Sequence, residues 1–175
     1  MNTVRKILVP IDFSEDSANG LNYAVLLAQK TQSEVIALHV THKKQADNFL
    51  ELLAVMEGYP MLNLPMGIPV DRLLREKASD LYNFIERMIR NPGQVKITRK
   101  VTLGIKTEKI LAVVKEERID LVVLGVRKTS FSPYLMARWK LLRAISRFPC
   151  PVLLTPFPDE PWPASRLIGS SIFVR

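Results

Sequence analysis

Hydrophobic runs alternate with amphipathic stretches along this chain, which predicts alternating strands and helices. The β-branched apolar run 4–11 is typical of a strand covered on both faces, and 34–40 has the same character. Between these strands, apolar residues recur at helical spacing over 15–31, and Ser14 provides an N-cap. A strand, a helix and a second strand in this order predict a βαβ unit with parallel strands.

The second half of the chain repeats this alternation after a less regular middle. The further strands are expected over 95–103, 120–125 and 152–155. The further helices are expected over 49–56, 70–91, 108–118 with Thr107 as cap, and 138–147. Together these elements predict an α/β fold, a three-layer sandwich around a five-stranded parallel sheet. Periodicity alone leaves flavodoxin-like and Rossmann-like windings open.

The length of 175 residues suits one domain with a single buried core. We place this α/β domain at 1–155, with an apolar, proline-rich insertion at about 43–69, and a proline-rich tail at 156–175. Exposed apolar segments commonly mark partner sites, so residues 59–69 and the tail are candidate docking segments for a protein partner. The end of the tail, 171–174, could equally add a strand to the edge of a sheet.

The net charge of +8 favours an anionic partner, but it selects no class of partner by itself. An aromatic content of 7%, without aromatics interleaved among the basic residues, argues against nucleic acid. No apolar run reaches the roughly 18 residues of a membrane span, although peripheral contact with an anionic membrane stays open. The single Cys150 excludes an internal disulfide, and a first strand without a secretory pattern before it predicts a cytoplasmic location.

The candidate site lies where the expected strands end. Ligands of open α/β sheets bind beyond the carboxyl ends of the strands, which places a crevice between Asp12 and Gly125. Asp12 is either an Asx-type cap before the first helix or a ligand contact, and both alternatives stay open. Gly125 is expected to serve a tight turn with or without a ligand. His39 and His42 lack Cys or carboxylate partners at metal spacing, so no metal site is expected.

Four segments carry a resemblance to a known family: Val9-Pro10-Ile11-Asp12-Phe13-Ser14, Ala37-Leu38-His39-Val40, Asp120-Leu121-Val122-Val123-Leu124-Gly125 and Pro149-Cys150-Pro151-Val152-Leu153-Leu154. Over roughly residues 3–155 the chain resembles the universal stress proteins. The resemblance implies a Rossmann-like sheet of the adenine nucleotide α-hydrolase-like kind with strand order 3-2-1-4-5, a homodimer and a link to stress responses. Some members bind ATP and others do not. In those that do, the resemblance implies that Asp12 contacts the nucleotide and that Val40 lies near the adenine.

The phosphate-binding motif of ATP-binding members is mostly lost here. That motif reads glycine, two residues, glycine, nine residues, glycine, then serine or threonine. Gly125 matches the first glycine, but Lys128 and Arg138 replace the other two and Trp139 replaces the hydroxyl residue. Lys128 and Arg138 could hold phosphate through their side chains, yet they also fill the space that glycines leave to a ligand.

Two functions from different classes remain. The favoured hypothesis is a non-catalytic, stress-related regulatory or accessory module that acts through protein association as a homodimer and needs no cofactor. The alternative is a switch that binds ATP or another adenine nucleotide in a degenerate site between Asp12 and Gly125. No nucleophile with its base and no paired carboxylates occur at recognisable spacing, so slow ATP hydrolysis is the one catalytic alternative left open.

Overall fold

The computed structural model describes residues 4–42, 67–89, 93–126, 145–156 and 172–174. In these ranges the strands are β1 (Lys6–Ile11), β2 (Glu34–Thr41), β3 (Ile97–Leu103), β4 (Leu121–Val126), β5 (Val152–Pro156) and β6 (Ile172–Val174). The helices are α1 (Glu15–Thr31), α3 (Gly67–Met88) and α4 (Lys106–Glu116). The helix expected over 49–56, most of the segment 59–69 and most of the helix expected over 138–147 lie outside the described residues.

One sheet holds all the described strands, in the order β3-β2-β1-β4-β5-β6. The first five are parallel, and β1 pairs with β2 on one side and with β4 on the other. This confirms the five-stranded parallel sheet of order 3-2-1-4-5. The strand order reverses between β1 and β4, so a crevice opens there beyond the carboxyl ends of the strands.

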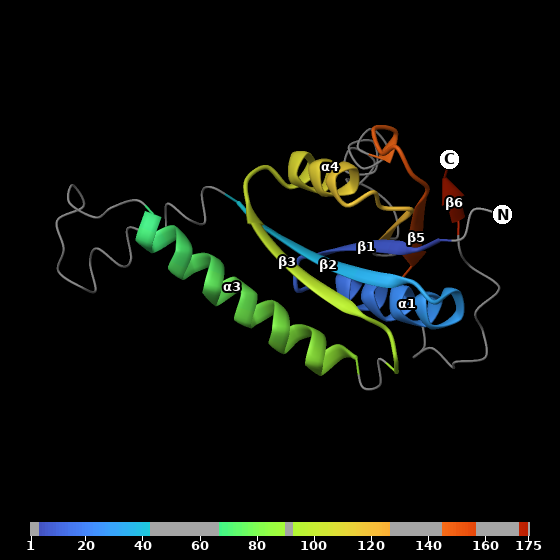
Figure 1. The fold of residues 1–175 in the computed structure, drawn as a ribbon, viewed down its shortest axis with the longest axis horizontal. Coiled ribbons are helices and arrows are strands. Elements are labelled where there is room, and N and C mark those ends of the chain that lie inside the picture. The colour runs from blue at the N-terminus through green and yellow to red at the C-terminus, as the bar shows by residue number, and fades with distance from the viewer. Residues whose placement is uncertain (1–3, 43–66, 90–92, 127–144, 157–171, 175) are drawn as a thin grey trace, which may run out of the picture.

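Helices cover both faces of the sheet, which gives three layers. Figure 1 shows α1 and α3 on one face and α4 on the other. On the first face, Ile7, Val9 and Val35 pack with Leu21 of α1 and Leu81 of α3. On the second face, a smaller core forms around α4; its buried residues include Leu8, Ile36, Val114, Val122 and Val152. Alternate strand residues therefore feed two separate cores, as the continuous apolar runs predicted.

Two helices differ from the predicted boundaries. α3 begins at Gly67, inside the segment that was expected to be irregular. The helix tolerates Pro69 because this residue falls in the first turn, where a missing N–H breaks no helical hydrogen bond. α4 begins at Lys106 with Ile105 as N-cap, so the prediction of Thr107 as cap is wrong. The turn before it is short because Gly104 takes φ +147°, a conformation rarely available to other residues.

The end of the tail lies against the domain itself. β6 pairs antiparallel with β5, with Val174 opposite Val152 and Ile172 opposite Leu154. In this arrangement residues 172–174 add a sixth strand to the edge of their own sheet, which confirms the expectation that this end of the tail could add to a sheet edge. Among the described helices, none has the combination of length and apolar composition that crossing a membrane requires.

Candidate functional site

A pocket opens at the point where the strand order reverses. Its volume is about 560 Å³, within the range of small-molecule sites. Three segments meet around it: the loop from β1 into α1, the start of α4, and the end of β4. Its apolar lining comes from Pro10, Ile105, Ile110, Leu124 and Phe148. Its polar lining includes Asp12, Ser14, Asp16, His42, Lys106 and Thr107.

Asp12 and Ser14 form a linked cap at the N-terminus of α1. The Asp12 Oδ1 atom accepts hydrogen bonds from the Ser14 backbone N–H at 3.2 Å and from the Ser14 hydroxyl at 2.5 Å. Ser14 Oγ in turn accepts from the Ser17 N–H at 3.2 Å, as an N-cap does. The predicted Ser14 cap and the Asx-type geometry of Asp12 are both confirmed.

The second carboxylate oxygen of Asp12 faces the pocket and Lys106. Lys106 Nζ lies 3.4 Å from Asp12 Oδ2, and both side chains are about half exposed, at 52% and 50%. Burial acts to raise the pKa of Asp12, but the hydrogen bonds from Ser14 and the charge of Lys106 outweigh it and lower that pKa. Asp12 is therefore a carboxylate at neutral pH that can accept hydrogen bonds from a ligand.

The start of α4 supplies the opposite wall. Its N-cap, Ile105, makes no side-chain hydrogen bond, and Ile105 is 53% exposed. The first N–H groups of α4 therefore have no side-chain cap, and they carry the positive end of the helix dipole beside Lys106. A ligand in this pocket therefore meets both apolar side chains and polar or charged ones, among them the Lys106 ammonium and the Asp12 carboxylate.

Gly125 lines the pocket, and the reason why this position must be a glycine differs from the expected one. It lies inside β4, opposite Thr155 of β5, so the prediction of a tight turn is wrong. A Cβ at this position would lie 1.6 Å from the backbone oxygen of Asp16. Gly20, about one turn further along α1, meets the same strand residue: a Cβ at Gly20 would lie 2.8 Å from Gly125 N. The glycine is required because α1 packs directly onto β4.

The other residues proposed from sequence separate into two groups. Val40 ends up partly buried against the second core and is not part of the pocket lining. Lys128 and Arg138 fall outside the described residues, so their phosphate contacts stay predictions. Sequence reasoning missed Lys106 as a partner of Asp12. The available signal was its place just after a strand, since the carboxyl ends of parallel strands share one edge of the sheet.

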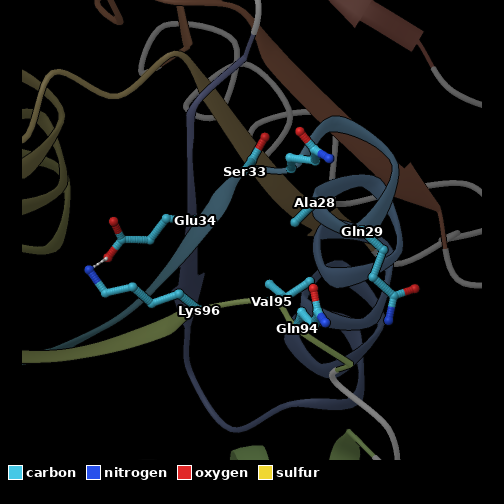
Figure 2. Close-up of a pocket in the computed structure, with 8 residues that line it drawn as sticks. Ala28, Gln29, Ser33, Glu34, Gln94, Val95 and Lys96 are labelled. Atoms are coloured by element: carbon cyan, nitrogen blue, oxygen red, sulfur yellow. Dashed lines mark ion pairs between the residues drawn. The ribbon is translucent and has the colours of Figure 1, made fainter.

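A second pocket, of about 460 Å³, lies at the opposite end of the strands. Figure 2 shows Glu34 and Lys96 facing each other on one side of it and Gln29 across from them. Glu34 Oε1 accepts from Thr98 at 2.5 Å and lies 3.1 Å from Lys96 Nζ. The hydrogen bond from Thr98 and the charge of Lys96 lower the pKa of Glu34. These groups satisfy one another, so the first pocket remains the stronger candidate.

Comparison with known proteins identifies the family of this chain. The sequence model of the universal stress protein family matches residues 3–156. Universal stress protein MJ0531 of Methanocaldococcus jannaschii is 27% identical over 160 residues, which cover 91% of this chain and 86% of that protein. Universal stress protein MJ0577 of the same organism is 26% identical over 136 residues, covering 75% and 83%.

Solved structures show the same fold at lower sequence identity. The structure of MJ0577 superposes with a TM-score of 0.60 at 20% identity, covering 90% of this chain and 99% of that one. A universal stress protein solved in complex with cAMP gives 0.55 at 15% identity, covering 89% and 98%. UspA from Lactobacillus plantarum gives 0.52 at 20% identity, covering 90% and 100%. With a family match over nearly its whole length, this chain belongs to the universal stress protein family.

Proposed function

We propose that this protein is a non-catalytic, stress-related regulatory domain that binds an adenine nucleotide in the pocket between Asp12 and Gly125. The observation that carries the proposal is the pocket itself: about 560 Å³ at the strand reversal, lined by apolar side chains together with polar and charged ones. A nucleotide needs both kinds of lining, because its base is flat and weakly polar while its ribose and phosphate are strongly polar.

The lining suggests where each part of the ligand would lie. Leu124, Ile110 and Phe148 offer the apolar surface for the base. Asp12 Oδ2 accepts hydrogen bonds and suits the ribose hydroxyls. Lys106 and the start of α4 suit phosphate, because a cation and a helix N-terminus both favour negative charge. A relative of the same fold solved with cAMP supports this ligand class.

Protein association, the hypothesis favoured from sequence, stays a prediction in this proposal. Residues 59–66 and 157–171 fall outside the described ranges, and residues 172–174 pair with β5 of their own chain. Homodimer formation is likewise proposed on the family alone. Nucleotide binding and protein association are compatible, since the affinity of a regulatory domain for its partner can depend on whether a nucleotide occupies the pocket.

Titration calorimetry with ATP, ADP, AMP and cAMP tests the proposal. We expect heat of binding for at least one of them, and no heat at millimolar ligand would overturn the proposal. Asp12→Asn keeps an oxygen acceptor for Ser14 but removes the charge, and Asp12→Ala removes both. We expect Asp12→Ala to lose about 10- to 100-fold in affinity, as for a hydrogen bond to a charged group.

Glu116→Gln is the matched control. Glu116 is an exposed carboxylate at the far end of α4 from Lys106, so it reports the loss of one negative charge without touching the pocket. Its affinity is expected to equal that of the wild type. Equal affinities for Asp12→Ala and Glu116→Gln would place the nucleotide elsewhere.

A further inference from the structure

A buried histidine lies directly behind the loop that carries Asp12. His39 is the sixth residue of β2, and 8% of its surface is exposed. Its Nδ1 atom lies 2.9 Å from the backbone carbonyl oxygen of Ile11. A carbonyl oxygen can only accept, so Nδ1 carries the proton and donates it. The imidazole thereby fixes the residue immediately before Asp12.

The same imidazole also contacts the residue immediately after Asp12. The rings of Phe13 and His39 lie 4.4 Å apart between centroids, at an interplanar angle of 36°. Phe13 has φ +64°, in the left-handed region where a bulky side chain is an outlier. Phe84 of α3 holds the other side of the Phe13 ring, at 5.5 Å and nearly edge-on. Packing thus maintains a backbone conformation that Phe13 would not adopt by preference.

We propose that His39 is a positioning residue of the nucleotide pocket, which holds Ile11 by a hydrogen bond and Phe13 by ring contact and so sets the direction of the Asp12 carboxylate between them. The inference rests on the proposed function. His39 touches no ligand; it acts through the two chain neighbours of Asp12. The unusual conformation of Phe13 turns the chain so that Asp12 and Ser14 face the pocket and each other.

The surroundings of His39 keep it neutral and therefore keep this arrangement constant. Burial lowers the pKa of His39, while the Ile11 carbonyl acts in the opposite sense. Of the charged groups around it, Lys77 of α3 and Lys106 of α4 lower the pKa further, and Asp12 raises it. A simple core position would be filled more favourably by an apolar side chain, because burying an imidazole has a desolvation cost.

Two substitutions separate positioning from packing. His39→Leu fills the space but removes the donor, whereas His39→Asn places an amide N–H close to the position of Nδ1. With AMP or cAMP, whichever the wild type binds, we expect His39→Leu to weaken binding at least 10-fold and His39→Asn to stay within about 3-fold of the wild type. Equal binding by His39→Leu and the wild type overturns the inference.

A measurement without ligand keeps this test separate from the proposed function. Amide hydrogen exchange at Ser14 reports its hydrogen bond to Asp12, and we expect faster exchange in His39→Leu and wild-type exchange in His39→Asn. If the wild type binds no nucleotide, the proposed function fails, but the exchange rates still decide the role of His39. If His39→Leu does not fold, ¹⁵N spectra of the wild type decide it: an Nδ1 without a proton overturns the inference.

Discussion

Replacing Gly125 by alanine tests whether packing of α1 on β4 explains this glycine. The new Cβ would lie 1.6 Å from the Asp16 oxygen and 2.4 Å from its carbonyl carbon. Ordinary contact begins at about 3.4 Å, so α1 must move by about 1.8 Å. Both overlapped atoms belong to the backbone, so no change of rotamer relieves the clash. We expect a loss of about 3 kcal/mol in the free energy of unfolding, the upper end of the usual range for overpacking.

Urea unfolding followed by circular dichroism measures this loss, and thermal unfolding should show a melting temperature lower by about 6–12 °C. Gly20→Ala is the matched control on the same contact. Its Cβ would need only about 0.6 Å more room, and alanine is favoured over glycine in a helix by about 1 kcal/mol. The overlapped atom is again a backbone atom, so we expect Gly20→Ala to destabilise the protein as well, but by less than Gly125→Ala. The reasoning is refuted if Gly125→Ala loses less than 1 kcal/mol, or less than Gly20→Ala.

Three further predictions follow from the described contacts. Ser14→Ala removes the N-cap of α1 and should cost about 1 kcal/mol in urea unfolding, while Ser79→Ala at an exposed position of α3 should cost nothing measurable. The folded state holds the pKa of His39 below 6.5, so the unfolded chain binds that proton more readily. The contribution of His39 to the free energy of unfolding should therefore fall between about pH 7.5 and about pH 5.5 by at most about 1.4 kcal/mol per pH unit, a slope that His39→Asn abolishes in this range. Burial, helped by the charge of Asp120, raises the pKa of Cys150 from 9.0 to about 11. A disulfide reagent at about pH 7.4 should therefore label the folded protein about 100-fold more slowly than the urea-unfolded chain, and equal labelling rates would contradict this.

The fold was readable from sequence because its strands are buried on both faces. Runs such as 7–11 and 35–38 can be apolar without interruption only where helices cover both sides of a parallel sheet. Element ends were less readable where no capping residue marks them. Ile105 begins α4 without a side-chain hydrogen bond, so the nearest hydroxyl residue, Thr107, attracted the prediction. The short strand at 172–174 depends on an edge provided by β5, and its own three residues did not determine it.

The site was only partly readable, because its contacts join residues that are distant in sequence. Lys106 and Asp12 are 94 positions apart, and no local pattern links them. Gly125 must be a glycine because the backbone of Asp16 lies against it. Asp16 is on α1, far from Gly125 in sequence, and only the fold brings the two together. Asp12 itself was found from sequence, because it follows a buried strand at the edge where parallel sheets bind ligands.

In the structure, the Asp12 carboxylate can cap α1 and contact a ligand at the same time. From sequence, a cap and a ligand contact were alternatives for one carboxylate. The two oxygens of Asp12 divide these roles: Oδ1 accepts hydrogen bonds from Ser14, and Oδ2 lies near Lys106 at the pocket. The cap fixes the side chain, and a fixed side chain loses less conformational entropy when it binds a ligand. The structural role of Asp12 therefore supports a binding role, and finding the cap is no evidence against the nucleotide.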